Sequence, residues 1–359
     1  IRDREGLQKV FDEHKFDACI HFAGLKAVGE SCAKPLEYYE NNMNGTFVLV
    51  DVMRKNGCKN IIFSSSATVY GDPAIIPITE ECPKGKCTNP YGQTKSMLEE
   101  VLMDIQKADN EWNVVLLRYF NPIGAHKSGS IGENPNGIPN NLMPYITQTA
   151  VGKRAELGVF GDDYDTHDGT GVRDYIHVVD LARAHVAALK AIVANKGIAI
   201  YNIGTGHGYS VLDVVKAFEK ANGVPVPYAI KPRRPGDIAT CYCNPAKAEA
   251  ELGWKAEFGI EEMCRDSWRN KSLEPECVVE ESDVPYDSHE CFETVDIKER
   301  IENFIDCLPE KPRCIMRMRM QGASAVEIAS VTGLSVENVY TILSRTRQLI
   351  RNFYNKING

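Results

Sequence analysis

Long apolar runs are missing from this 359-residue sequence, so no segment reaches the roughly eighteen residues that a membrane-crossing helix needs. The residue pattern of a secretory signal is missing too. Positive charge is scarce, with 41 Lys and Arg against 49 Asp and Glu, which argues against a nucleic-acid or membrane role for the whole chain. We therefore expect a cytoplasmic protein. The first residue is Ile1 rather than methionine, so we also expect a piece of a longer chain.

The twelve cysteines lack the spacing of a metal site or a disulfide framework. The two closest pairs, Cys82 with Cys87 and Cys241 with Cys243, are not Cys-x-x-Cys motifs, and no matching histidine cluster accompanies them. Free thiols and no bound metal are the expectation.

Lys and Arg are absent from residues 272–297, where nine acidic residues and two prolines predict an acidic linker. The chain length favours two or three domains. Buried strands and helices in residues 1–123 predict a parallel α/β sheet, to which parts of residues 172–210 return. Looser Gly-, Asn- and Pro-rich sequence predicts that residues 124–271 are mainly a smaller α/β substrate domain. Residues 298–359 are predicted to form a separate helical domain.

The stretch from Ser64 to Lys95 carries the most chemical information. Residues 60–63 predict a buried parallel strand that ends in the serines 64–66, and ligands bind beyond the carboxyl ends of such strands. Residues 91–106 then predict a helix on which Tyr91 and Lys95 share one face. A nearby ammonium favours a phenolate, so we expect Lys95 to lower the pKa of Tyr91. Tyr91 would then act as a base while Ser66 holds the substrate oxygen.

Further motifs follow in a fixed order along the chain: residues 21–31, HFAGLKAVGES; residues 117–122, LRYFNP; residues 140–144, NNLMP; residues 171–178, GVRDYIHV; and residues 201–206, YNIGTG. Together with the Ser64–Lys95 stretch they resemble the UDP-glucose 4-epimerases of the extended short-chain dehydrogenase/reductase family. The resemblance covers residues 1–271. It implies an incomplete Rossmann-like sheet, NAD as cofactor, a UDP-sugar substrate, and reversible hydride transfer through a 4-keto sugar.

The resemblance also implies roles for individual residues. Tyr91, Lys95 and Ser66 would be catalytic, and the cofactor would lie along Phe22, Lys26, Lys95 and Tyr119. The substrate would contact Ser66, Ala67, Thr68, Tyr119, Phe120, Asn121, Asn140, Asn141, Leu142, Gly158, Val159, Phe160, Arg173, Arg234, Asp237 and Cys241. A homodimer would form through the helices predicted at residues 35–56 and 91–106.

Several alternatives stay open from the residues alone. The less favoured alternative for Lys26 is a surface charge, and Arg233 competes with Arg234 for the diphosphate. The turn at residues 204–208 has the composition of a second dinucleotide loop, although in the resembled family it is an ordinary strand-to-helix connection. In the resembled family the position of Cys241 borders the sugar pocket, so the resemblance implies that this small residue leaves room for an N-acetyl group on the sugar. A 4,6-dehydratase is disfavoured because Ala67 and Thr68 stand where that chemistry needs an acid and a base.

The sequence has no glycine-rich strand–turn–helix before residue 18 that would cradle the pyrophosphate of a dinucleotide. We therefore expect the printed chain to bind NAD poorly or not at all. We also expect apolar faces of its sheet to be exposed.

The segment from 298 to 359 resembles region 4 of bacterial sigma factors. Helix, glycine turn and helix around residues 325–354 form a helix-turn-helix pattern, with a plain helical bundle as the alternative. The resemblance implies contact with DNA or RNA polymerase: base contacts from Asn338, Tyr340, Thr341, Ser344 and Arg345, and phosphate contacts from Arg347 and Arg351. A DNA-binding regulator that carries a degenerate epimerase fragment is thus the rival function.

Overall fold

The computed structural model describes residues 1–129, 131–133, 139–194, 197–234, 236–272, 304–306, 308–336, 338–343 and 345–346. The chain divides into two compact units, Ile1–Lys127 with Gly132–Trp268, and Ser128–Ile131 with Arg269–Gly359. The predicted acidic linker therefore lies outside the described residues, apart from its first residue.

The first unit contains alternating helices and strands. Its strands are β1 Cys19–His21, β2 Asn60–Ser66, β3 Asn113–Tyr119, β4 Asn121–Ile123, β5 Leu157–Phe160, β6 Val172–His177, β7 Gly197–Ile203, β8 Gly208–Ser210, β9 Tyr228–Lys231 and β10 Thr240–Cys241. Its helices are α1 Arg4–Glu13, α2 Val28–Ala33, α3 Pro35–Tyr39, α4 Gly45–Lys55, α5 Pro90–Ala108, α6 Leu142–Ala150, α7 Val178–Ala194, α8 Val211–Asn222, α9 Ala246–Leu252 and α10 Ile260–Ser272.

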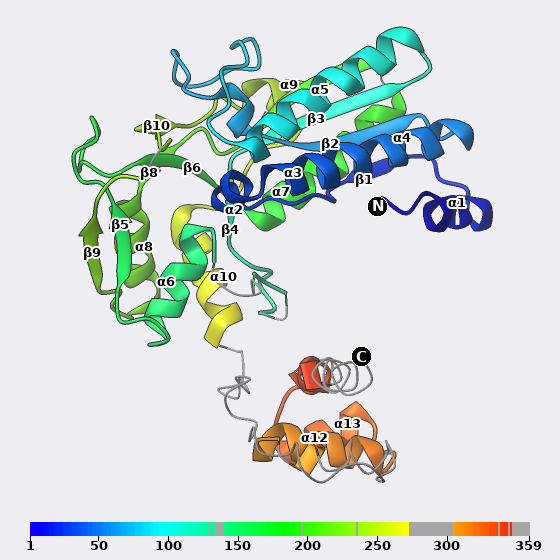
Figure 1. Ribbon diagram of the computed structural model, residues 1–359. Helices are drawn as coiled ribbons and strands as arrows, with labels where there is room; N and C mark the ends of the chain where they lie inside the picture. Colours follow the sequence, from blue (N-terminus) through cyan, green and yellow to red (C-terminus); the bar gives the residue numbers. More distant parts are fainter. Residues whose placement is uncertain are drawn as a thin grey trace. The chain divides into compact units, whose positions relative to one another are not determined.

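The main sheet is parallel throughout and has the order β1-β2-β3-β7. Alternate side chains of β2 enter two different cores, because successive residues of a strand point to opposite faces. Ile61 and Phe63 pack with α4 and α5, whereas Ile62 packs with α7. Figure 1 shows α4 and α5 along one face and α7 along the other. The sheet is thus covered on both sides, as a parallel sheet requires.

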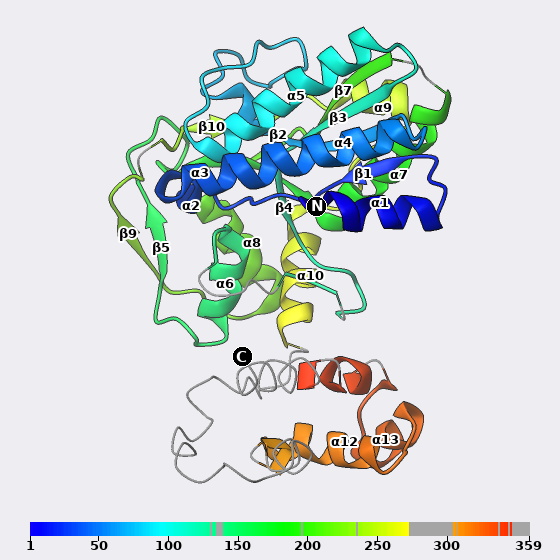
Figure 2. The same ribbon diagram turned by 45° about the vertical axis from the view of Figure 1, so that its right-hand side comes forward.

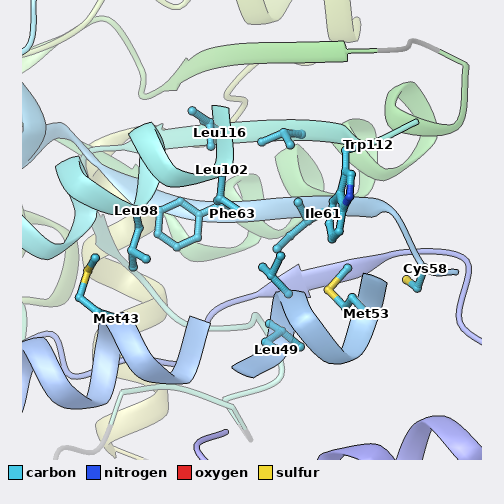
Figure 3. Packing of buried hydrophobic residues seen from close by; sticks show 12 residues of the cluster. Met43, Leu49, Met53, Cys58, Ile61, Phe63, Leu98, Leu102, Trp112 and Leu116 are labelled. Atoms are coloured by element: carbon cyan, nitrogen blue, oxygen red, sulfur yellow. The ribbon is translucent and has the colours of Figure 1, made fainter. Parts of the chain in front are cut away.

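The core between the sheet and helices α4 and α5 is dense and apolar. Figure 3 shows Leu98 and Leu102 from α5 reaching toward Phe63 and Leu116, with Met53 and Trp112 closing the far end. Strand β1 lies at one edge of the sheet. Among the described residues it pairs only with β2, and the nearby Phe22 side chain is exposed.

The helix predicted over residues 35–56 is interrupted where its asparagines lie. Residues Glu40–Asn44 form a π-helical turn between α3 and α4. The amide of Asn42 accepts a hydrogen bond of 2.8 Å from the Leu25 backbone N–H and donates to the Leu25 carbonyl and to the Thr94 hydroxyl. A wider helical turn lets Asn42 bind a loop instead of solvent, which explains a poor helix former at this position.

The remaining strands form two smaller sheets. One has the order β10-β6-β4 with β8 antiparallel to β6, and the other pairs β5 with β9. Figure 2 shows α6, α8 and α10 gathered beside β5 and β9. Their shared core includes Ile146 from α6, Phe218 from α8 and Met263 from α10.

The second unit contains α12 Glu310–Met320 and α13 Ala325–Thr332. A capping box between Ser324 and Glu327 starts α13, and Gly333 ends it at a φ of 71° that favours glycine. Residues 338–343 are helical again, and Val339 packs with Ile328 in one small core. Helix, glycine turn and helix are therefore present as predicted. Residues 347–359 lie outside the described part.

Candidate active site

The serine-rich end of β2 lies at the carboxyl-terminal edge of the main sheet, where parallel sheets bind ligands. Ser64, Ser65 and Ser66 are all buried. The register with β3 places Ser66 beside Tyr119. The strand therefore delivers three hydroxyl groups to one edge, with a tyrosine next to the last of them.

Helix α5 starts beside this edge because of the two residues before Tyr91. The side chain of Asn89 accepts a hydrogen bond of 2.8 Å from the Gly92 backbone N–H, and Pro90 takes the first helical position, which needs no N–H donor. Tyr91 and Lys95 follow within the first two turns and are both buried.

The structure brings the three predicted catalytic side chains together. The Lys95 ammonium donates a hydrogen bond of 2.6 Å to the Ser64 carbonyl, and its nitrogen lies 5.9 Å from the centre of the Tyr91 ring. The Ser66 side chain lies close enough to the Tyr91 phenol to act on its pKa, which it lowers. Tyr91, Lys95 and Ser66 thus lie together, buried between α5 and β2.

The predicted lowering of the Tyr91 pKa by Lys95 is wrong for this structure. Burial is the largest effect and raises the pKa of Tyr91 well above its ordinary value, with Tyr119 adding to the rise. Burial also lowers the pKa of Lys95 to about 8. The ammonium bonds the Ser64 carbonyl rather than the phenol, and the desolvation cost of the phenolate sets the direction of the shift.

Residues predicted to hold the cofactor lie at the ends of β1 and β3. Tyr119 is half-buried, and its side chain hydrogen-bonds Ser64. Phe22 is 57% exposed, and its ring lies 4.6 Å from the ring of His185. Lys26 is further out, with its nitrogen 3.8 Å from a Glu133 carboxylate oxygen.

Four polar residues close to this edge escaped the sequence analysis. His185 lies 3.3 Å from the Ser64 hydroxyl, and His21 lies 2.9 Å from the Thr46 hydroxyl. Glu99 and Arg118 form a buried ion pair at 2.6 Å. His21 and Arg118 stand inside the motifs 21–31 and 117–122, so position alone could have flagged these two but not Glu99 or His185.

The first group of predicted substrate-contact residues follows β2 and β3 directly. Ala67 and Thr68 begin a short 3₁₀ turn after Ser66, and the Thr68 hydroxyl is buried without a hydrogen-bond partner among the described residues. Phe120 is buried in one cluster with Cys241, while Asn121 is exposed. An unpartnered buried hydroxyl beside Ser66 provides a polar contact that a bound sugar could satisfy.

A second group of predicted residues gathers around β6 and α6. Arg173 on β6 pairs in register with Cys241 on β10, and its guanidinium donates to the Val172 carbonyl at 2.8 Å. Asn141 is the residue before α6 and donates to Glu133 at 2.9 Å. Asn140 beside it is exposed and Leu142 opens the helix.

The third group lies on β5 and the loop after β9. Gly158, Val159 and Phe160 belong to β5, where Val159 is buried and Phe160 is 40% exposed. The Arg234 guanidinium lies 4.8 Å from the centre of the Phe160 ring and donates to Asp237 at 2.9 Å.

The neighbouring arginine has different partners. Arg233 donates to Asp163 at 2.6 Å, and its guanidinium lies 4.0 Å from the centre of the Tyr164 ring. Arg234 therefore lies with the other predicted nucleotide contacts, and Arg233 belongs to a separate surface contact.

The glycine turn at residues 204–208 is used internally. The backbone N–H groups of Thr205 and Gly206 donate to the buried Asp174 carboxylate at 2.8 and 3.0 Å. Donors that already bind a carboxylate cannot cradle a phosphate, which favours the ordinary strand-to-helix connection.

One group of side chains has the composition of a cation site. His167, Asp168 and Asp213 hold ligand atoms within 4.8 Å of one another. Asp213, however, completes the capping box of α8, and Asp168 accepts a hydrogen bond of 2.5 Å from the Ser210 hydroxyl. Helix capping accounts for this cluster.

In the second unit, the described candidates for base contact lie around a short helical run. Tyr340 is 61% exposed and Arg345 is exposed. Val339, just before Tyr340, and Ile342, between the two, are buried. Asn338 and Thr341 are half-buried. Ser344, Arg347 and Arg351 lie outside the described residues.

The sheet, its Tyr-x-x-x-Lys helix and its serine strand end define a nucleotide-sugar-modifying protein of the short-chain dehydrogenase/reductase type. A family model described as GDP-mannose 4,6 dehydratase matches residues 1–267, and one described as Sigma-70, region 4 matches residues 298–350. The relatives of this chain are named after a different activity from the one in the first model's description.

The chain is 65% identical over 272 residues to the UDP-glucose 4-epimerase of Bacillus subtilis (strain 168), covering 76% of this chain and 80% of that protein. It is 58% identical over 275 residues to the UDP-glucose 4-epimerase of Homo sapiens, covering 77% and 79%. A crystal structure of the Bifidobacterium longum UDP-glucose 4-epimerase in complex with NAD⁺ and UDP matches with a TM-score of 0.74 and 60% identity, over 76% of this chain and 82% of that one. The chain belongs to the UDP-glucose 4-epimerase family.

Proposed function

We propose that this chain interconverts UDP-galactose and UDP-glucose. The observation that carries the proposal is the burial of Ser66, Tyr91 and Lys95 together at the end of a parallel strand, with the Lys95 nitrogen 5.9 Å from the centre of the Tyr91 ring and 2.6 Å from the Ser64 carbonyl. The 65% identity to a named epimerase over 272 residues supports it, and so does the Bifidobacterium longum complex with NAD⁺ and UDP.

In this mechanism Tyr91 exchanges a proton with the oxygen at C4 of the sugar. Tyr91 must lose its own proton before it can take the proton of the 4-hydroxyl, and burial opposes that loss. The protonated phenol formed in this step then returns the proton to the 4-keto oxygen when the sugar is reduced again. Ser66 holds the same oxygen and orients it toward Tyr91, and Lys95 supplies positive charge to the phenolate when the proton moves the other way. The 4-keto sugar must turn over between the two proton transfers.

The residues at this edge fit the nicotinamide end of NAD, which supplies a hydride acceptor and donor when bound. An exposed aromatic ring at Phe22, a half-buried phenol at Tyr119 and the buried Lys95 line the ends of three adjacent strands. Lys26, with its single long contact to Glu133, is free to reorient toward a phosphate. No metal is required for any of these steps.

On the substrate side, Thr68 would contact the sugar, and Asn121 and Asn140–Leu142 the phosphates. Arg173 and Arg234 would bind the diphosphate through their guanidinium forks. Asp237 would accept hydrogen bonds from ribose hydroxyls, and residues 158–160 would also contact the substrate. The boundaries proposed for these roles are 1–123 with part of 172–210 for the cofactor and 124–271 for the substrate.

Two finer properties complete the proposal. Cys241 leaves room for an N-acetyl group at C2, so the UDP-N-acetyl sugars would also be substrates. The protein would act in the cytoplasm. It would form a homodimer through α3, α4 and α5, and the interface would bury the exposed apolar side chains Leu36, Phe47 and Met97. None of the described helices is long and apolar enough to cross a membrane.

Turnover of UDP-galactose with added NAD tests the main proposal. It should be measured for the printed chain and for a version carrying a glycine-rich strand–turn–helix segment before Ile1. Formation of UDP-glucose by the extended version supports the assignment, and no turnover in either version would contradict it. In the active version, Cys241→Tyr should remove activity on UDP-N-acetylgalactosamine alone; an equal loss of both activities would count against the pocket assignment.

A second function is favoured for the C-terminal unit by its match to a Sigma-70, region 4 model. Contact with promoter DNA or RNA polymerase would use the exposed residues of this short helical run, among them Tyr340 and Arg345. Fluorescence anisotropy of the full chain with promoter DNA should show binding that weakens steeply with salt, because phosphate contacts release counterions. Tyr340→Ala should weaken it, whereas Val326→Ala on α13 should not. An absence of binding at low salt would end this proposal.

A further inference from the structure

A buried ion pair lies directly behind the catalytic edge. Glu99 on α5 is one turn beyond Lys95 and fully buried, and its carboxylate accepts hydrogen bonds from the Arg118 guanidinium at 2.9 and 2.6 Å. Its third donor is the Ser65 hydroxyl, at 2.5 Å. Burying two charges opposes folding unless the geometry is good, so a bidentate pair with a further hydrogen bond indicates a requirement other than stability alone.

The partners of Glu99 form a row across the sheet. Ser65 on β2, Arg118 on β3 and Asn202 on β7 are neighbours in register on three adjacent strands. Tyr70 connects the last two, because its hydroxyl accepts from Arg118 at 3.0 Å and donates to Asn202 at 2.7 Å. The carboxylate of Glu99 therefore attaches α5 to a row of residues that spans the central part of the sheet.

Three successive residues of β2 each bind a different residue of one α5 face. The Ser64 carbonyl accepts from Lys95, Ser65 donates to Glu99, and Ser66 bonds Tyr91. Tyr91, Lys95 and Glu99 are spaced four apart and therefore share that face. Glu99 is the one member of the three that would contact neither cofactor nor substrate, yet its carboxylate accepts three hydrogen bonds from the sheet.

Glu99 also acts on the charge of Lys95. Burial lowers the pKa of Lys95 to about 8, and the Glu99 carboxylate opposes this by raising it. The other titratable groups around the Tyr91–Lys95 pair are His21 on β1, Tyr38 on α3 and Tyr119 on β3. Burial favours the neutral form of each, since it lowers the pKa of His21 and raises those of Tyr38 and Tyr119. Two cations besides Lys95 face Glu99, namely Arg118 and Lys84, whose nitrogen lies 3.9 Å from the carboxylate. Glu99 is the anion of this set.

We propose that Glu99, held by Arg118 and Ser65, is a positioning residue that fixes the Tyr91–Lys95 face of α5 against β2 and keeps Lys95 protonated. This inference rests on the proposed epimerase function. The catalytic pair would otherwise be free to shift by a fraction of a helical turn, and displacements near 1 Å cost about a hundredfold in rate.

The deciding variant is Glu99→Gln, which keeps the shape and an acceptor for Ser65 but removes the charge. We expect kcat for UDP-galactose to fall by about ten- to a hundredfold with little change in KM, because Glu99 touches no substrate. The Lys95 titration, followed by the ¹³Cε chemical shift in lysine-labelled protein with Lys95→Arg for assignment, should move to lower pH. The matched control is Asp104→Asn, an exposed acid on the same helix that should change neither quantity.

Glu99→Gln leaves Arg118 buried and unpaired, so a loss of folding has to be separated from a loss of positioning. The double variant Glu99→Gln/Arg118→Gln removes that unpaired charge and should recover thermal stability while kcat stays low. Recovery of kcat together with stability would overturn the inference, because the pair would then serve folding only. An unchanged Lys95 titration in Glu99→Gln would also overturn it.

The titration does not require turnover and therefore separates this inference from the proposed function. A Lys95 shift in Glu99→Gln, without epimerase activity in either the printed chain or the extended version, would defeat the function and leave the action of Glu99 on Lys95 intact. Normal epimerase activity in Glu99→Gln would support the function and overturn the positioning role of Glu99.

Discussion

The edge at β2 and α5 and the group around β5 and β9 are built in opposite ways. At the first, Ser66, Tyr91 and Lys95 are buried and hydrogen-bonded, and the pair behind them is fully buried. At the second, Phe160 is 40% exposed and Arg234 meets Asp237 at the surface. Both groups were predicted from sequence to bind one nucleotide-sugar.

The contrast separates two tasks. Groups that move protons gain from a fixed, water-poor environment in which charges act strongly. Groups that capture a charged ligand from solution must be accessible, and they gain rigidity only when the ligand arrives. The first region is therefore predicted to respond to substitution in turnover, and the second in substrate binding.

The largest expected effect comes from removing the Tyr91 hydroxyl. Tyr91→Phe keeps the ring in its packed site but removes the proton donor, so kcat should fall by about 10²- to 10⁴-fold. Steady-state assay and thermal unfolding measure the two consequences separately. Tyr201→Phe is the matched control, because that buried phenol bonds Glu251 away from the site and its loss should leave turnover unchanged. Comparable losses in both variants would contradict a catalytic role.

The second effect concerns pH and the buried His21 beside the site. Burial lowers the pKa of His21 from 6.5 to about 4. At pH values between these two, the unfolded chain binds a proton at His21 that the folded state does not bind. Stability is complete above pH 6.5 and falls as pH drops toward 4, by about 3 kcal/mol in total. Thermal unfolding of His21→Gln should show a smaller loss over this window. Parallel curves for both proteins would disprove the assignment.

Sequence reasoning located the catalytic edge because its signals are local. The strand before Ser64 and the four-residue spacing of Tyr91 and Lys95 lie within one short stretch. The helix-turn-helix of the second unit was recognisable for the same reason, from the glycine turn between two helical patterns. The π-helical turn at Asn42, in contrast, is explained only by tertiary contacts.

The pKa of Tyr91 could not be predicted, because desolvation depends on everything packed around the phenol. Spacing alone suggested a lowered value; the packed site raises it. Glu99 was missed for a related reason. Its importance depends on the register of β2 with β3, which brings Ser65 and Arg118 together from positions 53 residues apart in the sequence. Long-range register has no local signature.

The third prediction sharpens the contrast at the accessible group. Arg234→Lys should raise KM for UDP-galactose about tenfold with little change in kcat, because an ammonium cannot bind a diphosphate through two parallel hydrogen bonds. Arg233→Lys is the matched control, since Arg233 is engaged by Asp163 and Tyr164. Steady-state kinetics of both variants decide between them. A larger KM effect in Arg233→Lys would reverse the assignment.

The smallest expected effect comes from breaking the surface pair of Arg234 with Asp237. Both side chains meet water, so Asp237→Asn should cost less than about 1 kcal/mol of stability. That difference from the unmodified chain should shrink further in high salt, which screens exposed charges. Thermal unfolding at low and high salt measures it, with Glu99→Gln as the buried counterpart whose cost should barely respond to salt. If the two pairs proved equally costly and equally insensitive to salt, the distinction between a fixed catalytic edge and an adaptable binding surface would fail.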